Sequence, residues 1–392
     1  MSLKQILPKL KEVNKHLNFL KSSFTKGGFR HVTNYIDGLI TLNKKTIRQI
    51  SKASIDEHHH SAISRIVTRA KFEQEKLEHR YLKKVGYLTK NHYTSLIFDD
   101  SLVERNGKHV EETQSHKDHS SNSFITGHQF FTSFIHTPFI QLPLFPKLYS
   151  KNTESKIEMA LDLIDKVSQT IELDAVLMDS WYSDKKIIKK CLTKHIKVVC
   201  GIKTNRSISL KKGEWQPLSE LSVHIPKKDV EYYYIDERKY MIADYTVKLN
   251  GIPHVKMLVS KEYLERKKEW SDNFHLISTD VKDTPVKIIR QYNLRWCIET
   301  FHWDIKQNLG FDTVFLQKKE GIVRHAIFVV VAYIILKLFM FYRGMNMTVG
   351  ECITYVQDKE MDGFIREIVE IENKEERINY FEEVFIRKTA KV

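Results

Sequence analysis

The chain of 392 residues has few cysteines, no internal repeat and no long uninterrupted apolar run. Its four cysteines are scattered without a CxxC pair, which argues against a disulfide framework and a zinc ribbon and fits a reducing compartment. In the most apolar segment, residues 326–342, only 11 residues precede Lys337, whereas a helix that crosses a bilayer needs about 20. We therefore expect a soluble protein with no membrane partner, in which this segment is a buried core helix.

Positive charge dominates the composition but is distributed unevenly along the chain. The formal net charge is +14, and residues 1–90 hold 19 Lys and Arg against 7 Asp and Glu. The other 302 residues hold 44 basic residues against 42 acidic ones. A strongly basic N-terminal segment in an otherwise nearly neutral chain favours a nucleic-acid-binding region at the N-terminus. A Lys-rich, solvated helical surface is the simpler alternative.

The periodicity of apolar residues divides the chain into five segments. Residues 1–90 show helical spacing, and two of these helices form either a helix-turn-helix that presents Arg65 and Arg69 or part of a plain bundle. Strands, then helix–strand–helix–strand alternation, follow in residues 91–203, which is typical of a mixed α/β sheet. An antiparallel β insertion, rich in Tyr and Val, is expected over 204–275. The core then resumes over 276–345, and a charged helical region covers 346–392.

Three acidic residues have positions that suggest chemistry. Asp99 and Asp179 each follow an apolar run, and we expect each to lie at the end of a buried strand, with an Asn106–Gly107 hairpin turn after the first strand. Glu299 lies on a helix that follows a third such strand. Acids at strand ends point into the crevice where α/β sheets bind ligands. Three converging carboxylates need a cation between them, and oxygen ligands favour Mg²⁺ or Mn²⁺.

The segment YNLRWCIETFHWDIK, residues 292–306, predicts one continuous helix with two distinct faces. The buried stripe contains Leu294, Ile298, Phe301, Ile305 and Leu309. The opposite arc is a row about 21 Å long that contains Tyr292, Arg295, Glu299 and Lys306. An ordinary surface helix would explain Arg295 and Glu299 as an i,i+4 ion pair, but not the other two residues. We expect the tryptophans at 181, 296 and 303 to pack around this helix.

The segments LIFDDS, AVLMDSWYSD and YNLRWCIETFHWDIKQNLG resemble the insertion-sequence-4 family of DDE transposases. The last segment fits the family pattern of Tyr, two residues, Arg, three residues, Glu, six residues and Lys without a gap. The resemblance extends over roughly residues 30–345. It implies a ribonuclease-H-like catalytic core with an N-terminal helical DNA-binding region.

The resemblance also implies roles for individual residues. Asp99, Asp179 and Glu299 would be the catalytic carboxylates and the ligands of two Mg²⁺ or Mn²⁺ ions. Asp99 is preferred to its neighbour Asp100 because the family pattern resembles Asp-x-Ser/Thr. The DNA contacts would be Tyr292, Arg295 and Lys306, with Trp270, or alternatively Trp215, stacked on a flipped base.

The implied activity is metal-dependent cut-and-paste transposition. Water nicks the end of the element, the freed 3′-hydroxyl forms a hairpin with the opposite strand, and the reopened end is joined to target DNA. The expected partners are double-stranded terminal inverted repeats, target DNA and a second copy of the chain in a synaptic complex, in the prokaryotic cytoplasm at the nucleoid. The alternatives are a metal-dependent nuclease without strand transfer, a catalytically silent or domesticated DNA-binding relative, and a zinc hydrolase built on the histidines.

Overall fold

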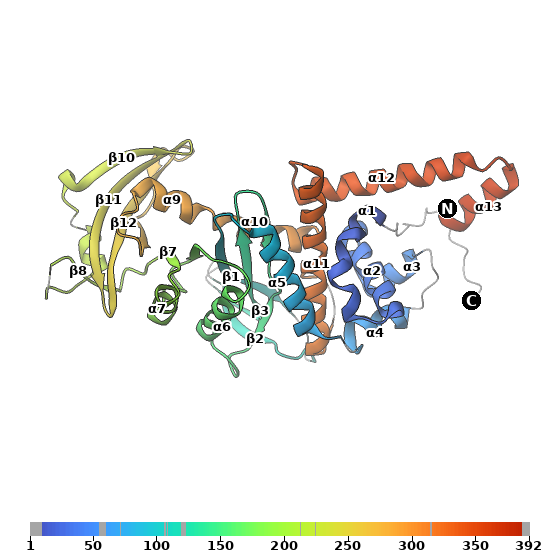
Figure 1. Ribbon diagram of the computed structural model, residues 1–392, viewed down its shortest axis with the longest axis horizontal. Coiled ribbons are helices and arrows are strands. Elements are labelled where there is room, and N and C mark those ends of the chain that lie inside the picture. Colours follow the sequence, from blue (N-terminus) through green and yellow to red (C-terminus); the bar gives the residue numbers. More distant parts are fainter. Residues whose placement is uncertain are drawn as a thin grey trace.

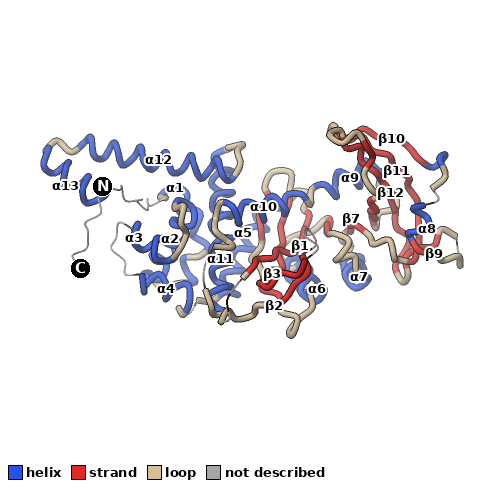
Figure 2. Tube along the Cα trace, turned by 180° about the vertical axis from the view of Figure 1, so that it is seen from behind, coloured by secondary structure: helices blue, strands red, loops and turns tan. Residues whose placement is uncertain are grey.

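The computed structural model describes residues 10–54, 60–70, 72–105, 107, 109–118, 123–211, 213–223, 225–313 and 316–385. The molecule is elongated, with a helical region at one end, a mixed sheet with helices in the middle and a β-rich region at the other end (Figure 1). The secondary structure changes along the same axis, from helices to strands (Figure 2).

Residues 10–90 form the expected helices, and threonines start two of them. The hydroxyl groups of Thr25 and Thr46 accept hydrogen bonds from the backbone N–H groups of Gly28 and Gln49, which stabilises both helix starts. The α3 and α4 helices contact each other and α2, while residues 55–59 between them lie outside the described residues. The helices are α1 (Lys11–Asn14), α2 (Lys26–Thr41), α3 (Ile47–Ala53), α4 (His60–Thr68) and α5 (Gln74–Thr89).

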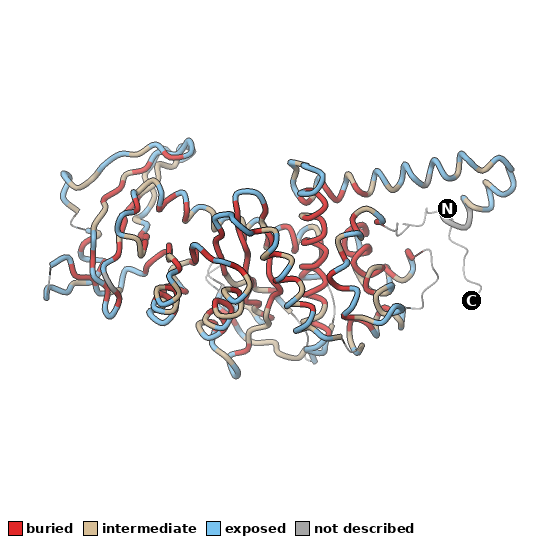
Figure 3. The backbone as a smooth tube through the Cα atoms, in the orientation of Figure 1, coloured by how far each residue is buried: buried red, intermediate tan, exposed pale blue. Residues whose placement is uncertain are grey.

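The apolar segment near residue 330 is a core helix, as expected. It belongs to α11 (Lys319–Arg343), which is long and apolar enough to cross a membrane by length and composition alone. However, 83% of its most apolar stretch is buried inside the protein. It contacts α1, α2 and α4 on the side of the helical region and α10 and β4 on the side of the sheet (Figures 1 and 3). The helical region and the region of the sheet therefore share this helix.

The central sheet has the expected mixed α/β, ribonuclease-H-like arrangement. Its strands follow the order β2-β3-β1-β6-β7, antiparallel between β1 and β3 and parallel from β1 through β6 to β7. The strands are β1 (Ser95–Glu104), β2 (Gln114–Asp118), β3 (Ser123–His136), β4 (Gln141–Pro143), β5 (Lys147–Tyr149), β6 (Ala175–Met178) and β7 (Lys197–Gly201). The helices α6 (Lys156–Ser168) and α7 (Lys185–Thr193) make the connections to the parallel strands.

Two details of the first strand differ from the expectation. The β1 strand does not end at Asp99 but continues to Glu104, because its partner β3 is 14 residues long and pairs with it up to Gly127. The strand that follows β1 in the chain, β2, pairs with β3 and not with β1. The expected hairpin between consecutive strands is thus wrong, and Asn106 itself lies outside the described residues.

The β insertion is antiparallel, as expected, and it continues the central sheet. Beyond β7 the order runs β14-β12-β11-β8-β9, and β14 pairs with both β7 and β12. The elements are β8 (Ser207–Ser209), β9 (Gln216–Pro217), α8 (Leu218–Val223), β10 (Val230–Ile235), β11 (Arg238–Leu249), β12 (Ile252–Leu264), β13 (Glu269–Trp270) and β14 (Phe274–Ser278). Because β14 leads directly into the next helix, the insertion and that helix are held by one sheet.

Two further helices extend from the end of α11 away from the sheet (Figure 1). They are α12 (Val349–Glu370) and α13 (Lys374–Phe385). The first part of α12 packs on α11 and α2, whereas its second part is exposed (Figure 3). A capping box, in which Thr348 and Glu351 bond to each other's backbone, starts α12.

The close approach of α2 and α3 gives a test of the helical core. A Cβ atom at Gly38 would lie 2.5 Å from Cγ1 of Ile50, a fully buried residue that cannot move aside. We expect Gly38→Ala to lower the free energy of unfolding by about 1–3 kcal/mol because it overpacks this contact.

Thermal melting followed by circular dichroism measures the effect, and Gly363→Ala on α12 is the control. A Cβ atom at Gly363 meets nothing within 4 Å, so this change should stabilise the helix by about 0.5–1 kcal/mol. A rise in melting temperature for Gly38→Ala would contradict the packing described here.

Candidate active site

The sheet places Asp99 beside Asp179. In the parallel pairing of β1 with β6, Ile97 lies opposite Leu177, and two residues further along each chain are Asp99 and Asp179. Neighbouring strands are about 4.8 Å apart, so the two residues are adjacent at the point where β6 ends. The Asp179 carboxylate is fixed by its Oδ1 atom, which accepts hydrogen bonds from the backbone N–H groups of Trp181 (2.9 Å) and Tyr182 (3.2 Å).

Asp100 lies on the other face of the strand and has its own partners. Its carboxylate forms an ion pair with Lys156, the first residue of α6, and accepts a hydrogen bond of 2.6 Å from the Tyr182 hydroxyl. Successive side chains of a strand point to opposite faces, so only Asp99 faces the helix that carries Glu299. The choice of Asp99 as the catalytic acid stays a prediction, and this geometry supports it.

The segment expected to be one helix is two helices joined by a tight turn. They are α9 (Pro285–Asn293) and α10 (Trp296–Gln307). Around Leu294 and Arg295 the backbone N–H groups bond to carbonyl groups three residues back, which is the tighter 3₁₀ spacing. The expected single straight helix from Tyr292 to Lys306 is therefore wrong, although Tyr292 still lies beside Arg295 at this turn. The buried stripe is confirmed for Ile298, Phe301, Ile305 and Leu309, while Leu294 is only partly buried.

Arg295 lies between two of the candidate carboxylates. One terminal nitrogen of its guanidinium, Nη1, is 3.1 Å from Oδ2 of Asp99, and the other, Nη2, forms an ion pair with Glu299. The Arg295 side chain is only 16% exposed, and those of Asp99 and Glu299 are 21% and 32% exposed. The guanidinium thus connects β1 to α10 and brings residues 99 and 299 to one place.

The electrostatics of this site favour an added positive charge. The pKa of the Asp99 carboxyl is raised to about 7, mainly because the group is buried. The carboxylates of Asp179 and Asp100 also raise this pKa, whereas the Arg295 charge and the backbone N–H of Asp100 lower it. Tyr292 lies 5.6 Å from the Arg295 guanidinium, and burial raises the pKa of its hydroxyl to about 12. Tyr292 is therefore a neutral hydrogen-bond donor at physiological pH.

Residues that could hold a metal ion are adjacent, but Arg295 separates two of them. No three His, Cys, Asp or Glu side chains of the described residues are close enough together to hold one ion. The donor set nevertheless fits a divalent cation, because Asp99 and Asp179 repel each other and offer only oxygen ligands. The Arg295 guanidinium lies between Asp99 and Glu299 and supplies the positive charge that these two carboxylates need.

The structure places the other predicted contacts as follows. Lys306 points toward β1, and its Nζ atom donates to the carbonyl oxygen of Leu102 at 3.0 Å. Arg65 on α4 and Arg69, one residue beyond the end of α4, are exposed, and α11 lies between that helix and α10 (Figure 1). Trp296 and Trp303 are 68% and 60% exposed, so the expectation that they pack around the active-site helix is wrong.

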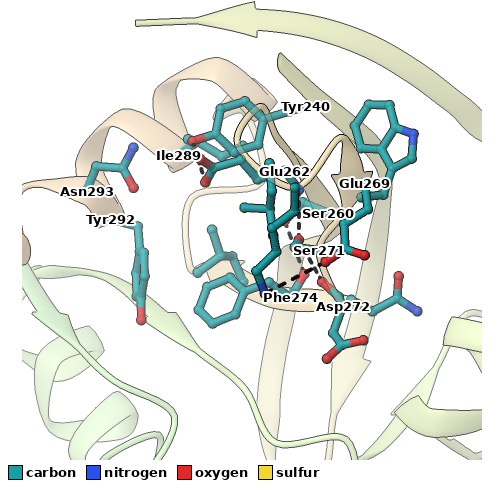
Figure 4. Close-up of a pocket in the computed structure, with 15 residues that line it drawn as sticks. Tyr240, Ser260, Glu262, Glu269, Ser271, Asp272, Phe274, Ile289, Tyr292 and Asn293 are labelled. Carbon is teal, nitrogen blue, oxygen red and sulfur yellow. Dashed lines mark hydrogen bonds and ion pairs between the residues drawn. The ribbon is translucent and has the colours of Figure 1, made fainter. Parts of the chain in front are cut away.

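The two candidate tryptophans differ in position, because Trp270 lines a pocket together with Tyr292 and Trp215 does not. A pocket of about 660 Å³ is lined by Trp270 from β13 and by Tyr292 and Asn293 from α9. Figure 4 shows Tyr292 and Asn293 on one side of this pocket, with Glu269 and Asp272 on the other. Trp215, which is 47% exposed, lies just before β9 and does not line this pocket.

Sequence reasoning missed several residues that contact the carboxylates. Lys156 and Tyr182 bind Asp100, and Thr132 and His302 form hydrogen bonds next to Asp99. Thr132 lies directly opposite Asp99 in the register of β1 and β3. That position could be found only from the pairing of the strands. His302 could have been noticed from its place one helical turn after Glu299.

Two protein-family models match this sequence. A family model described as a transposase DDE domain matches residues 90–335, and a model described as a DDE superfamily endonuclease matches residues 20–155. No curated protein matches the sequence. A cryo-EM structure of a piggyBac transposase synaptic complex with hairpin DNA is similar over 98% of this chain and 83% of that chain, with 10% identity and a TM-score of 0.49. Since the first family model covers more than half of the chain, from before β1 into α11, the protein belongs to the transposase DDE domain family.

Proposed function

We propose that this protein is a cut-and-paste DNA transposase of the insertion-sequence-4 type, with Asp99, Asp179 and Glu299 as its catalytic carboxylates. The observation that carries the proposal is the meeting of three distant segments at one place. The register of β1 and β6 puts Asp99 next to Asp179, and Arg295 joins Asp99 to Glu299 of α10.

Two Mg²⁺ or Mn²⁺ ions would be held by these three carboxylates. When bound, such ions activate the attacking oxygen and stabilise the leaving oxygen of a phosphodiester. The protein supplies a partly buried pair of aspartates whose mutual repulsion a cation relieves. Glu299 becomes available to such a cation when Arg295 releases it.

The DNA phosphates would take Arg295 from the carboxylates. Arg295 and Tyr292 line a pocket of about 390 Å³ together with Arg238 and Asp236, so two arginines and one acidic residue border the same space. A guanidinium binds a phosphate with two parallel hydrogen bonds. When the DNA end binds, Arg295 would thereby exchange its two ion pairs for a contact with a phosphate. Lys306, which now donates to the carbonyl oxygen of Leu102, would contact a second phosphate.

The proposed reaction has three stages. Water first cleaves a phosphodiester at the end of the element and leaves a 3′-hydroxyl and a 5′-phosphate. The 3′-hydroxyl then attacks the opposite strand and forms a hairpin, which water reopens. The 3′ ends are finally joined to target DNA.

Hairpin formation requires a distorted DNA end, and the 660 Å³ pocket supports Trp270 as the ring that holds a flipped base. The indole ring of Trp270 packs against those of Tyr232 and Tyr263, with centroid distances of 6.0 and 5.3 Å, which fixes its orientation. Base–aromatic stacking contributes about 1–3 kcal/mol per base. Because Tyr292 lies in the same pocket, a base held there would be next to the cleavage site.

The remaining segments would bind DNA and a second copy of the chain. Residues 1–90 would bind the terminal inverted repeat, with the exposed Arg65 and Arg69 on its phosphates. The core segments 91–203 and 276–345 would carry out catalysis, and the insertion 204–275 would hold the distorted DNA end. Residues 346–392 would form a C-terminal helical region. Two copies of the chain would act together as a homodimer in a synaptic complex on target DNA.

The first test removes one catalytic acid. Asp179→Asn should reduce nicking of linear DNA that carries the element's ends by about a hundredfold or more in Mg²⁺, because a metal ligand is lost. Products are separated on denaturing gels. Asp184→Asn is the matched control, because Asn caps α7 as well as Asp does and should leave the rate unchanged. If Asp179→Asn and the parent cut DNA at equal rates, Asp179 is not a catalytic residue. If the parent makes nicks that are never joined to target DNA, the protein is a nuclease without strand transfer.

The second test concerns Arg295 and metal loading. Arg295→Gln should bind Mn²⁺ about tenfold more tightly than the parent in the absence of DNA, equivalent to about 1.4 kcal/mol, because the cation no longer competes with a guanidinium. Isothermal titration calorimetry measures this affinity. Arg290→Gln is the control, since Arg290 of α9 pairs with Asp236 in the turn between β10 and β11, where both side chains are exposed. Unchanged Mn²⁺ affinity in Arg295→Gln would show that the arginine does not occupy the metal site.

The third test separates the two candidate tryptophans. Trp270→Ala should slow hairpin formation about tenfold while nicking continues, because only the second step needs the flipped base. Trp215→Ala should leave both steps unchanged. The two rates are measured on one DNA end with native and denaturing gels. The opposite pattern would assign the stacking role to Trp215.

A further inference from the structure

A chain of hydrogen bonds connects α10 to the backbone of Asp99 without using any carboxylate. The Thr132 hydroxyl donates to the carbonyl oxygen of Asp99 at 2.9 Å. The same hydroxyl oxygen is 2.7 Å from Nε2 of His302. Because the hydroxyl hydrogen is used on the carbonyl group, the oxygen accepts from the imidazole, and Nε2 of His302 carries the hydrogen.

The two side chains are well placed for such a connection. Thr132 is 1% exposed and lies opposite Asp99 in the antiparallel register, so both side chains are on the face of the sheet that meets α10. His302 lies one helical turn after Glu299, on the same side of α10. Burial, together with the smaller effects of the Lys306 and Arg295 charges, lowers the pKa of the His302 imidazole to about 3. The ring is therefore neutral and keeps one N–H donor over the physiological range.

We propose that His302 and Thr132 are positioning residues that hold the catalytic strand at a fixed distance from the catalytic helix. This inference rests on the proposed function. The direct link between Asp99 and Glu299 is the Arg295 ion pair, which is lost when the arginine turns to a DNA phosphate. The connection from His302 through Thr132 to the Asp99 carbonyl does not involve Arg295 and survives that change. It would keep the two carboxylates in place at the moment when they must bind the cations.

One further contact supports the same arrangement. The Nζ atom of Lys306, one turn beyond His302, donates to the carbonyl oxygen of Leu102 on β1. If Lys306 is drawn to DNA, this link is lost together with that of Arg295. His302 and Thr132 would then supply a polar contact between α10 and the β1–β3 pair that depends on neither Arg295 nor Lys306.

The test compares variants that remove the hydrogen bonds with variants that keep them. Thr132→Val has the same shape as threonine but no hydroxyl, and Thr132→Ser keeps the hydroxyl. His302→Phe removes the donor, and His302→Gln retains an N–H at the end of the side chain. Each full-length variant is bound to a DNA end, and its Mn²⁺ affinity is measured by electron paramagnetic resonance of the free ion, alongside the single-turnover nicking rate.

Thr132→Val and His302→Phe should weaken Mn²⁺ binding about tenfold in the DNA complex and slow nicking by a similar factor, with DNA affinity unchanged. Thr132→Ser and His302→Gln should stay within about threefold of the parent. The double variant Thr132→Val/His302→Phe should be no worse than either single change, because both interrupt one connection. Thr41→Val, which removes a buried hydroxyl that donates to the backbone carbonyl oxygen of Asp37 on α2, controls for general destabilisation and should leave Mn²⁺ binding unchanged.

Equal Mn²⁺ affinities for Thr132→Val and Thr132→Ser would overturn the inference. So would effects that multiply in the double variant, because the two residues would then act independently. If the parent protein bound Mn²⁺ but did not cut DNA, the proposed function would fail. The comparison of Mn²⁺ affinities would still decide whether His302 and Thr132 position the carboxylates.

Discussion

The ion pairs that Arg295 makes with Asp99 and Glu299 join two parts of the chain separated by almost 200 residues. They solve an electrostatic problem, since α10 can pack against β1 only if the facing carboxylates are neutralised. The raised pKa of Asp99 reflects the same problem, because burial and the nearby Asp179 both disfavour its charged form. A site that needs a positive charge to close is also suited to a divalent cation. The guanidinium and the metal ions would thus serve the same electrostatic need at different stages.

The site depends on parts of the molecule that are far from it. The β14 strand pairs with β7 of the core and with β12 of the insertion, so the helices that follow β14 are held by both. This continuity brings Tyr292 into one pocket with Trp270 from the insertion. On the other side, α11 packs against the N-terminal helices as well as against α10. The helical region is therefore connected to α10 through one core helix.

Much of this arrangement could be predicted from local patterns. The helices, the core strands, the β insertion and the buried stripe of α10 follow from the spacing of apolar residues, since each element must bury one side. Other features could not be predicted. The segment around Leu294 and Arg295 contains neither Pro nor Gly, so nothing in it indicated the turn between α9 and α10. The continuation of β1 beyond Asp99 depends on the length of β3, and the exposure of Trp296 and Trp303 depends on which neighbours cover α10.

The amino-acid sequence by itself determined which acidic, cationic and aromatic side chains are available for chemistry, because the functional groups of a side chain are set by its covalent structure. It also determined the type of each main element through the period of its apolar residues. Only the tertiary structure decided which of these groups meet. The opposition of Thr132 and Asp99 comes from a strand register, and the Arg295 bridge comes from the packing of α10 on β1. Such contacts between distant residues depend on how whole elements pack, and local sequence does not record that packing.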